Sequence, residues 1–262
     1  DLTLCRSGII TRDDYLRQTQ QTIRSEWSKD AHQRHSVYWA SRNVWHRFGG
    51  EEEGPRVDYY AAGEVLGMLI DLEIRGVTKN KKSLDDVMRF MNRWFGERRM
   101  GFEEDDVERA CTAVSNHDFS EFFARHVRGQ VNPPFGRCLA QAGIDYSEVS
   151  YDCDLPIAVN EQEDGTWNVR IRRGSAPKDD GLERGDRIVT VAGKPAGKVA
   201  DILKVGKAGD EIEVGYLRGE DKTVKTVKLK LMAKRTFVPK LSWKENATPE
   251  ELIIRESWLS GN

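Results

Sequence analysis

The sequence predicts an α+β protein in which a helical part is followed by a β-rich part. Up to about residue 145, apolar side chains recur with the spacing of a helix face. After Tyr146 they alternate with polar side chains at period two, between frequent glycines. The 262 residues suffice for two domains that each bury a core. We therefore expect a helical domain over 1–147, a β-rich domain over 148–234, and a tryptophan-containing tail over 235–262 that packs back on the helices.

Composition and charge exclude several classes of function. The chain is 38% hydrophobic and 32% charged, with a formal net charge of −2. A nearly neutral chain gives no electrostatic reason to expect nucleic acid or an anionic membrane as a partner. No stretch approaches the roughly 20 apolar residues of a transmembrane helix, so we expect no membrane span. The chain starts at Asp1 rather than at Met, from which we expect a processed or partial chain.

The first strong helix signal is a capping box at Thr11–Asp14. The Thr11 hydroxyl can accept a hydrogen bond from the Asp14 amide, while the Asp14 carboxylate reaches back to the Thr11 amide. Apolar and small side chains then recur every four residues, which predicts one buried stripe: Tyr15, Thr19, Ile23 and Trp27.

Two further helices are expected before residue 75. One runs from about Val37 to Phe48, with Trp39 and Trp45 as packing anchors, and an acidic loop follows it. The other, from Tyr59 to Ile74, is apolar nearly all round, which is typical of a central helix covered on every side.

The remaining elements follow from caps, breakers and periodicity. A second capping box at Ser83–Asp86 opens a helix that should stop at Gly96. Further helical segments are expected around Val107–Val114, over Asp118–His126, and from Pro134 to Ala142. In the β-rich part, alternation predicts strands over Trp167–Ile171, Glu211–Tyr216 and Val224–Leu231.

Cysteines and histidines give no metal signature within this chain. The four cysteines form no C-x-x-C pair, so we expect buried free thiols, although a disulfide stays open. Among the five histidines only His32 and His35 lie close together, without an acid between them or an evident third ligand. The acids at 85–86 and 103–106 belong to helix starts, where carboxylates complement the helix dipole.

The segment Asp58–Gly63, followed by Ser83–Met88, resembles the second half of the catalytic domain of the glycyl aminopeptidases. These are bacterial zinc peptidases of the thermolysin-like (gluzincin) group. In that family two tyrosines, a variable residue, lysine and glycine follow one another, and here Tyr59, Tyr60, Ala61, Ala62 and Gly63 occupy those places. Similarity also extends over the start of the chain and the segment 118–143, so that it spans about residues 1–145.

By position, Tyr60 matches the family tyrosine whose phenol donates a hydrogen bond to the oxyanion of the tetrahedral intermediate. Negative charge develops on the carbonyl oxygen during attack on a peptide, and a neutral phenol aimed at it stabilises that charge. Tyrosine phenols have a reference pKa of about 10, so they stay protonated at neutral pH. The alternative is a tyrosine that merely packs at a helix start. Ala62 stands where the family has lysine, which puts substrate fit and activity in question.

The resemblance also implies what this chain does not contain. The family's zinc ligands are an H-E-x-x-H pair of histidines and a downstream glutamate, and this sequence has neither motif. The ligands would therefore lie upstream of Asp1, and this chain alone should neither hold catalytic zinc nor cleave peptides. The family resemblance implies removal of N-terminal glycine or alanine from peptides by the whole protein. The compartment is left open between the cytoplasm and the periplasm.

The β-rich part resembles a PDZ domain in the segments Gly174–Pro177, Gly181–Gly193 and Gly209–Arg218. PDZ domains bind a peptide C-terminus by strand addition, with backbone amides holding the terminal carboxylate. That loop should lie at Leu155, Pro156, Ile157 and Ala158, although Pro156 lacks a backbone donor. A PDZ fold kept only as a packing module is an alternative to peptide capture. For the whole chain, the alternative to a peptidase is a non-enzymatic adaptor that uses this groove.

Overall fold

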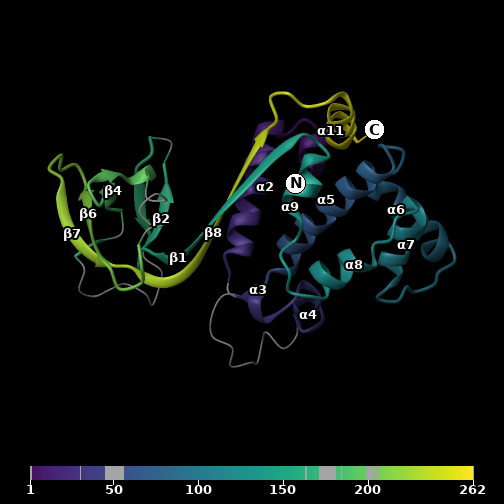
Figure 1. Ribbon diagram of the computed structural model, residues 1–262, viewed down its shortest axis with the longest axis horizontal. Helices are drawn as coiled ribbons and strands as arrows, with labels where there is room; N and C mark the ends of the chain where they lie inside the picture. Colours follow the sequence, from purple (N-terminus) through teal and green to yellow (C-terminus); the bar gives the residue numbers. More distant parts are fainter. Residues whose placement is uncertain are drawn as a thin grey trace. The chain divides into compact units, whose positions relative to one another are not determined.

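The computed structural model describes residues 2–29, 31–44, 56–162, 164–170, 181–183, 185–198, 203 and 206–261. It mixes helices and sheets, so the predicted α+β class is confirmed. The chain divides into two compact units, one formed by residues 1–148 with 238–262 and the other by residues 149–237. Figure 1 shows the helices of the first unit and the sheet of the second.

The first unit is built around one long helix, α5, which runs from Tyr59 to Val77. The helices of this unit, in chain order, are α1 (Leu2–Arg6), α2 (Arg12–Trp27), α3 (Ala31–Arg34), α4 (Val37–Arg42), α5, α6 (Leu84–Met91), η2 (Asn92–Gly96), α7 (Asp106–Ser115), α8 (Ser120–Phe122), η3 (Phe123–Val127), α9 (Phe135–Ala140) and α11 (Pro249–Ser260). Of these, η2 and η3 are single π-helical turns. Among the described residues, α5 packs against helices α2, α4, α6, α7, α9 and α11, which lie around it in Figure 1.

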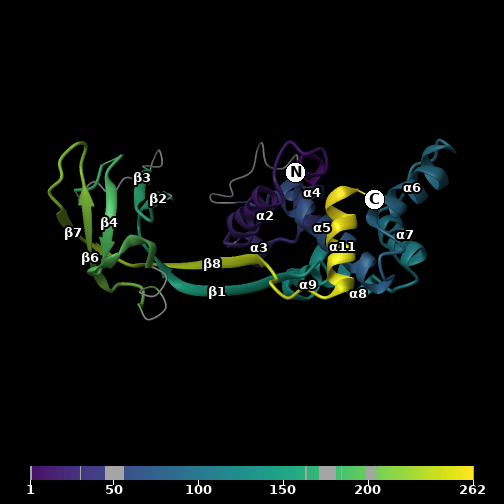
Figure 2. The ribbon, with the colours of Figure 1, turned by 90° about the horizontal axis from the view of Figure 1, so that it is seen from above.

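The core of this unit lies between α2, α5 and α11. Helix α11, near the C-terminus, packs against α1 and α5 (Figure 2). Its Trp258 is fully buried and meets the edge of the Tyr15 ring at 5.5 Å between centroids. The whole predicted stripe of α2 is buried, so that prediction is confirmed. Burying large apolar side chains in this way supplies the main stabilisation of the unit.

Helix starts in this unit follow the local sequence. The capping boxes predicted at Thr11–Asp14 and Ser83–Asp86 are both present. A third, not predicted, opens α11 at Thr248 and Glu251, with Pro249 in the first turn. Each box satisfies donors that a helix start otherwise leaves without a partner.

Two predictions about the helices before residue 75 were wrong. Helix α4 ends at Arg42, where the Asn43 side chain donates to the carbonyl of Trp39, rather than continuing to Phe48. Trp39 is 41% exposed and stacks on His35, so it is not a core anchor. Trp45, Phe48 and the acidic residues 51–55 lie outside the described residues.

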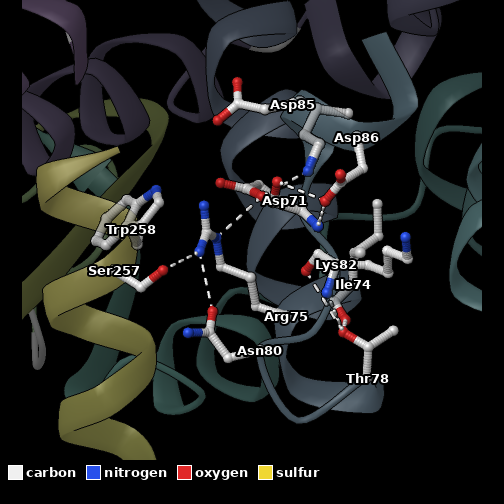
Figure 3. A network of polar contacts seen from close by, with 12 residues as sticks. Asp71, Ile74, Arg75, Thr78, Asn80, Lys82, Asp85, Asp86, Ser257 and Trp258 are labelled. Atoms are coloured by element: carbon white, nitrogen blue, oxygen red, sulfur yellow. Dashed lines mark hydrogen bonds and ion pairs between the residues drawn. The ribbon is translucent and has the colours of Figure 1, made fainter. Parts of the chain in front are cut away.

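A buried ionic network holds α5 to the elements around it, as Figure 3 shows. Nε of Arg75 donates to Oδ1 of Asp71 at 3.1 Å. One guanidinium nitrogen also donates to Asn80 and to the hydroxyl of Ser257, each at 2.9 Å. Asp71 additionally accepts from the Leu84 amide at 2.7 Å, and burial raises the pKa of its carboxyl despite Arg75. Residues from α5, α6 and α11 are thus joined by one pair of buried charges.

The second unit is an antiparallel sheet. Its strands are β2 (Ala158–Glu161), β3 (Trp167–Arg170), β4 (Arg187–Val191), β5 (Lys194–Pro195), β6 (Glu211–Leu217) and β7 (Lys225–Lys230). The described strands follow the order β2-β3-β4-β6-β7, and β5 pairs with β4. The strands predicted over Trp167–Ile171, Glu211–Tyr216 and Val224–Leu231 are present as β3, β6 and β7. Burial alternates in β3 and β7, where Val169 and Leu229 are buried, but β6 buries Val214, Gly215 and Tyr216 in succession. Residue 171 lies outside the described residues.

Two long strands contain the boundaries between the units. They are β1 (Ile144–Asp154) and β8 (Met232–Trp243), and they pair with each other in a separate two-stranded sheet. Within the first unit, the indole nitrogen of Trp243 donates to Asp13 at 2.7 Å, and the Leu241 amide donates to Gln20 at 2.8 Å. These bonds fix the end of β8 on α2.

An ion pair with a buried carboxylate lies within the second unit. Arg218 donates to both carboxylate oxygens of Asp186, at 2.9 and 2.8 Å, and Asp186 is 2% exposed. Burial acts to raise the pKa of Asp186, but the bonds from Arg218 and from the Glu183 amide hold that pKa below its ordinary value. The pair therefore favours the folded sheet when Asp186 is ionised.

All four cysteines are buried and free, which confirms the expected thiols. Burial raises the pKa of Cys111 to about 12. Across the described residues, no helix combines the length and hydropathy that crossing a membrane requires.

Candidate functional site

Tyr60 lies in the first turn of α5, where the backbone is fixed by Asp58. The Asp58 carboxylate accepts from the amides of Tyr60 and Ala61, at 3.0 and 3.3 Å. Its carbonyl accepts the Ala62 amide at 2.8 Å and so begins the helical hydrogen bonding. Asp58 is thus an N-cap, a position at which aspartate is among the preferred residues.

The phenol of Tyr60 points away from the core. Its side chain is 75% exposed, although α5 was predicted to be covered on every side. The Tyr59 ring lies against it, with 4.4 Å between the ring centroids. Ala62 and Val65, one turn further along, are 0% and 2% exposed. The first turn of α5 therefore presents a hydroxyl donor outward from a backbone that is anchored in the core.

Ala62, which occupies the place of the family lysine, is fully buried. A lysine here would bring a charged ammonium into a packed interior, which is costly without a partner. The local packing of this chain therefore suits alanine. Any anchoring role of that lysine has no counterpart at this position.

A buried carboxylate lies behind this turn. Glu26, in the last turn of α2, is 1% exposed. Its Oε1 accepts from the Asp58 amide at 2.7 Å and pairs with Nε2 of His32 at 3.0 Å. Lys29 binds the other oxygen. Sequence reasoning missed Glu26, and its only signal was an acid placed one residue before the buried Trp27.

A cavity of about 450 Å³ lies elsewhere in this unit, and Tyr60 does not line it. Glu73 forms part of its wall, is 3% exposed and binds Arg137, with His117 at 3.8 Å. The Cys138 thiol also donates to Glu73, and burial raises the pKa of that thiol. The charges of the buried wall are therefore paired within the protein.

Metal ligands do not gather in the part of the chain that the structure describes. Within it, no three His, Cys, Asp or Glu side chains stand where they could hold a metal ion together. His32 is hydrogen-bonded to Glu26, and His35 stacks on Trp39. The residues at hand do not fit a catalytic zinc ion.

The residues predicted as a carboxylate-binding loop lie just before β2. Leu155 is 5% exposed, and its amide donates to the side chain of Asp154 at 2.9 Å. Pro156 and Ile157 are half-buried, and Ala158 starts β2, which is at one end of the described strand order. Because the Leu155 amide is engaged and Pro156 has no N–H, two positions of the loop offer a ligand no donor. The glycine segment 174–177 lies outside the described residues.

Comparison with known proteins gives one family match. Residues 1–66 match the model of the M61 glycyl aminopeptidase family, and this range includes Tyr59 and Tyr60. A search of curated proteins returns no match.

Among the solved structures that are similar to the chain are the following two. One is an aminopeptidase N family protein from Idiomarina loihiensis, with 20% identity and a TM-score of 0.61 over 98% of this chain and 46% of that one. The other is the HtrA-type protease AlgW with tripeptide, with 18% identity over 33% of each chain. Its TM-score of 0.26 carries no argument about the second unit.

These comparisons confirm the predicted resemblance at the level of family and fold. The family match lies in the helical unit, and the fold is shared with an aminopeptidase-like structure. Both agree with a C-terminal part of an M61 glycyl aminopeptidase. The chain spans about half the length of the aminopeptidase N family structure.

Proposed function

We propose that this chain is the C-terminal part of a zinc-dependent aminopeptidase that removes N-terminal glycine or alanine from peptides. The observation that carries the proposal is the placement of Tyr60. Its phenol is 75% exposed at the start of a buried helix, within the residues that match the peptidase family. A hydroxyl donor at a surface, carried by an anchored helix turn, suits stabilisation of charge that appears during a reaction.

The proposed role of Tyr60 is to donate a hydrogen bond to the carbonyl oxygen of the scissile peptide bond. That oxygen gains negative charge as the tetrahedral intermediate forms, so the bond strengthens in the transition state. Removing one such donor typically costs about 3–4 kcal/mol of barrier reduction. The bonds from the Tyr60 and Ala61 amides to Asp58 fix the backbone from which the phenol extends.

Under this proposal, zinc binds to ligands upstream of Asp1, as the family resemblance implies. The described residues do not fit the ion, and no reaction step is assigned to them beyond the donor role of Tyr60. This chain by itself is then inactive. The proposed partners of the whole protein are peptide substrates.

For the second unit we propose a PDZ module. The antiparallel sheet and the terminal position of β2 in the strand order support it, because PDZ domains add a ligand strand beside an edge strand. The engaged Leu155 amide and Pro156 argue against strong capture of a terminal carboxylate. Peptide C-termini therefore stay a proposed ligand class that would depend on strand pairing.

The test is Tyr60→Phe in the complete peptidase, assayed with glycyl and alanyl amides. We expect kcat to fall about 10²–10³-fold, because the oxyanion loses its donor while the ring still packs. Tyr59→Phe is the matched control, with an expected change of less than about threefold. Circular dichroism should show the same fold in both variants. Unchanged turnover in Tyr60→Phe would remove this residue from the mechanism.

The sequence upstream of Asp1 separates the peptidase from the adaptor alternative. An H-E-x-x-H motif followed by a glutamate supports the peptidase. A native protein without that motif would favour the adaptor, and peptide binding along β2 would then be the activity to measure.

A further inference from the structure

The amide of a helix N-cap needs an acceptor, and α5 obtains one in an unusual way. In the described helices that begin with a capping box, α2, α6 and α11, the acceptor is the acid three residues after the N-cap. Those bonds are Thr11 N–H to Asp14 at 3.3 Å, Ser83 N–H to Asp86 at 2.9 Å, and Thr248 N–H to Glu251 at 2.7 Å. In α5 the equivalent position is Ala61, whose side chain has no acceptor. The Asp58 amide instead donates to Glu26, 32 residues away, at 2.7 Å.

Glu26 completes the cap of α5 from a neighbouring helix. Its carboxylate is almost fully buried, and a buried charge is tolerated only when donors surround it. Three donors do so here: the Asp58 amide, the His32 ring and the Lys29 ammonium. Because Asp58 in turn holds the amides of Tyr60 and Ala61, the orientation of the first turn depends on this carboxylate.

We propose that Glu26 is a positioning residue for Tyr60: it completes the cap of α5 from α2 and so holds the turn that carries the phenol. The inference rests on the proposed function, since it gives Glu26 a role in turnover through the tyrosine. Glu26 does not itself touch the substrate. Its effect is to hold the Asp58 N-cap, and with it the direction of the phenol.

The test uses Glu26→Met and Glu26→Gln in the complete peptidase. Displacing a catalytic group by about 1 Å can cost about 10²-fold in rate. We expect Glu26→Met to lower kcat about 10–100-fold with KM changed less than about threefold. Glu26→Gln retains an acceptor oxygen for the Asp58 amide, and we expect it to keep kcat within about fivefold of the unmodified enzyme.

Glu251→Met is the matched control. Glu251 also accepts from an N-cap amide, that of Thr248, and from a lysine, Lys244, but it lies in α11. This variant should lose stability and keep kcat. If it lowers kcat as much as Glu26→Met does, the effect of Glu26 is merely structural and the inference is wrong.

A double-mutant cycle with Tyr60→Phe separates the inference from the function on which it rests. If Glu26 acts through Tyr60, the double variant has the same kcat as Tyr60→Phe alone. Effects that multiply would overturn the positioning role and leave the role of Tyr60 intact. If Tyr60→Phe has no effect by itself, the proposed function fails instead.

Position 61 provides the last test. Ala61→Glu in the Glu26→Met background rebuilds a local capping box and should restore protection of the Asp58 amide from hydrogen exchange. If Glu26 acts by completing the cap, kcat should recover to within about fivefold of the unmodified enzyme. Restored amide protection without recovery of kcat would overturn the positioning role.

Discussion

Replacing Arg75 with methionine should destabilise the helical unit by about 3–5 kcal/mol. The guanidinium and the Asp71 carboxylate are only 3% and 6% exposed, so they form a buried pair (Figure 3). Methionine fills a similar volume but leaves Asp71 as a buried charge without its cation. Removal of one partner of a buried pair typically costs about 3–5 kcal/mol.

The magnitude follows from the bonds that are lost. Arg75 donates to the oxygens of Asn80 and Ser257, and because the guanidinium is charged each bond contributes at least about 1.5 kcal/mol, so that the two supply about 3 kcal/mol at the lower end. Stranding Asp71 supplies the rest, reduced by the Leu84 amide that still donates to it. Asp71→Asn added to Arg75→Met should recover about 1–2 kcal/mol, because a neutral amide oxygen can still accept from Leu84.

Urea unfolding followed by tryptophan fluorescence is a suitable assay. Of the seven tryptophans only Trp167 lies in the second unit, so the signal reports mainly on the helical unit. Arg89→Met is the control, because the Arg89–Asp86 pair is exposed and such pairs contribute about 0–1 kcal/mol. Equal destabilisation by Arg75→Met and Arg89→Met would refute the reasoning.

The pH dependence of the Arg75→Met effect gives a second check. Burial already raises the pKa of Asp71, and loss of the cation raises it further. A raised folded-state pKa gives stability that is present below the unfolded pKa and lost as pH rises through the folded value. The penalty of Arg75→Met should therefore shrink as pH falls from 7 toward 4. A penalty that grows in acid would contradict the stranded-charge explanation.

Three further predictions concern other parts of the chain. Because the pKa of Asp186 is lowered in the folded protein, its pairing with Arg218 stabilises the sheet above pH of about 4, and this stabilisation is lost as pH falls through the folded pKa. Asp186→Asn should therefore make stability depend less on pH in acid, which circular dichroism can follow. Gly143→Ala should lower the melting temperature more than Gly8→Ala, although both glycines have positive φ. A Cβ at residue 143 would lie 2.5 Å from a guanidinium nitrogen, whereas a Cβ at residue 8 meets nothing within 4 Å. Equal shifts of the two melting temperatures would contradict this. With its pKa raised to about 12 by burial, Cys111 should resist alkylation at pH 8 in the folded protein and react only after unfolding, which mass spectrometry can measure.

The sequence by itself determined the elements whose signals are local. The capping boxes and the four-residue stripe of α2 depend on side chains three or four positions apart, and the alternation of β7 depends on neighbours. Such patterns are complete within one element, so the α+β class and the position of Tyr60 in the first turn of α5 followed from them. The expected role of the Tyr60 phenol as a hydrogen-bond donor came from the family resemblance, because periodicity says nothing about chemistry.

Only the tertiary structure decided which charges are buried and which large side chains are exposed. The buried Glu26 accepts from the Asp58 amide, 32 residues away, and the buried Arg75 donates to Ser257, 182 residues away, as well as to its helix neighbour Asp71. Trp39, expected in the core, is 41% exposed and stacks on His35. The physical reason is the same in each case. Burial of a polar or aromatic group depends on partners that the chain brings together only on folding, and no local pattern records them.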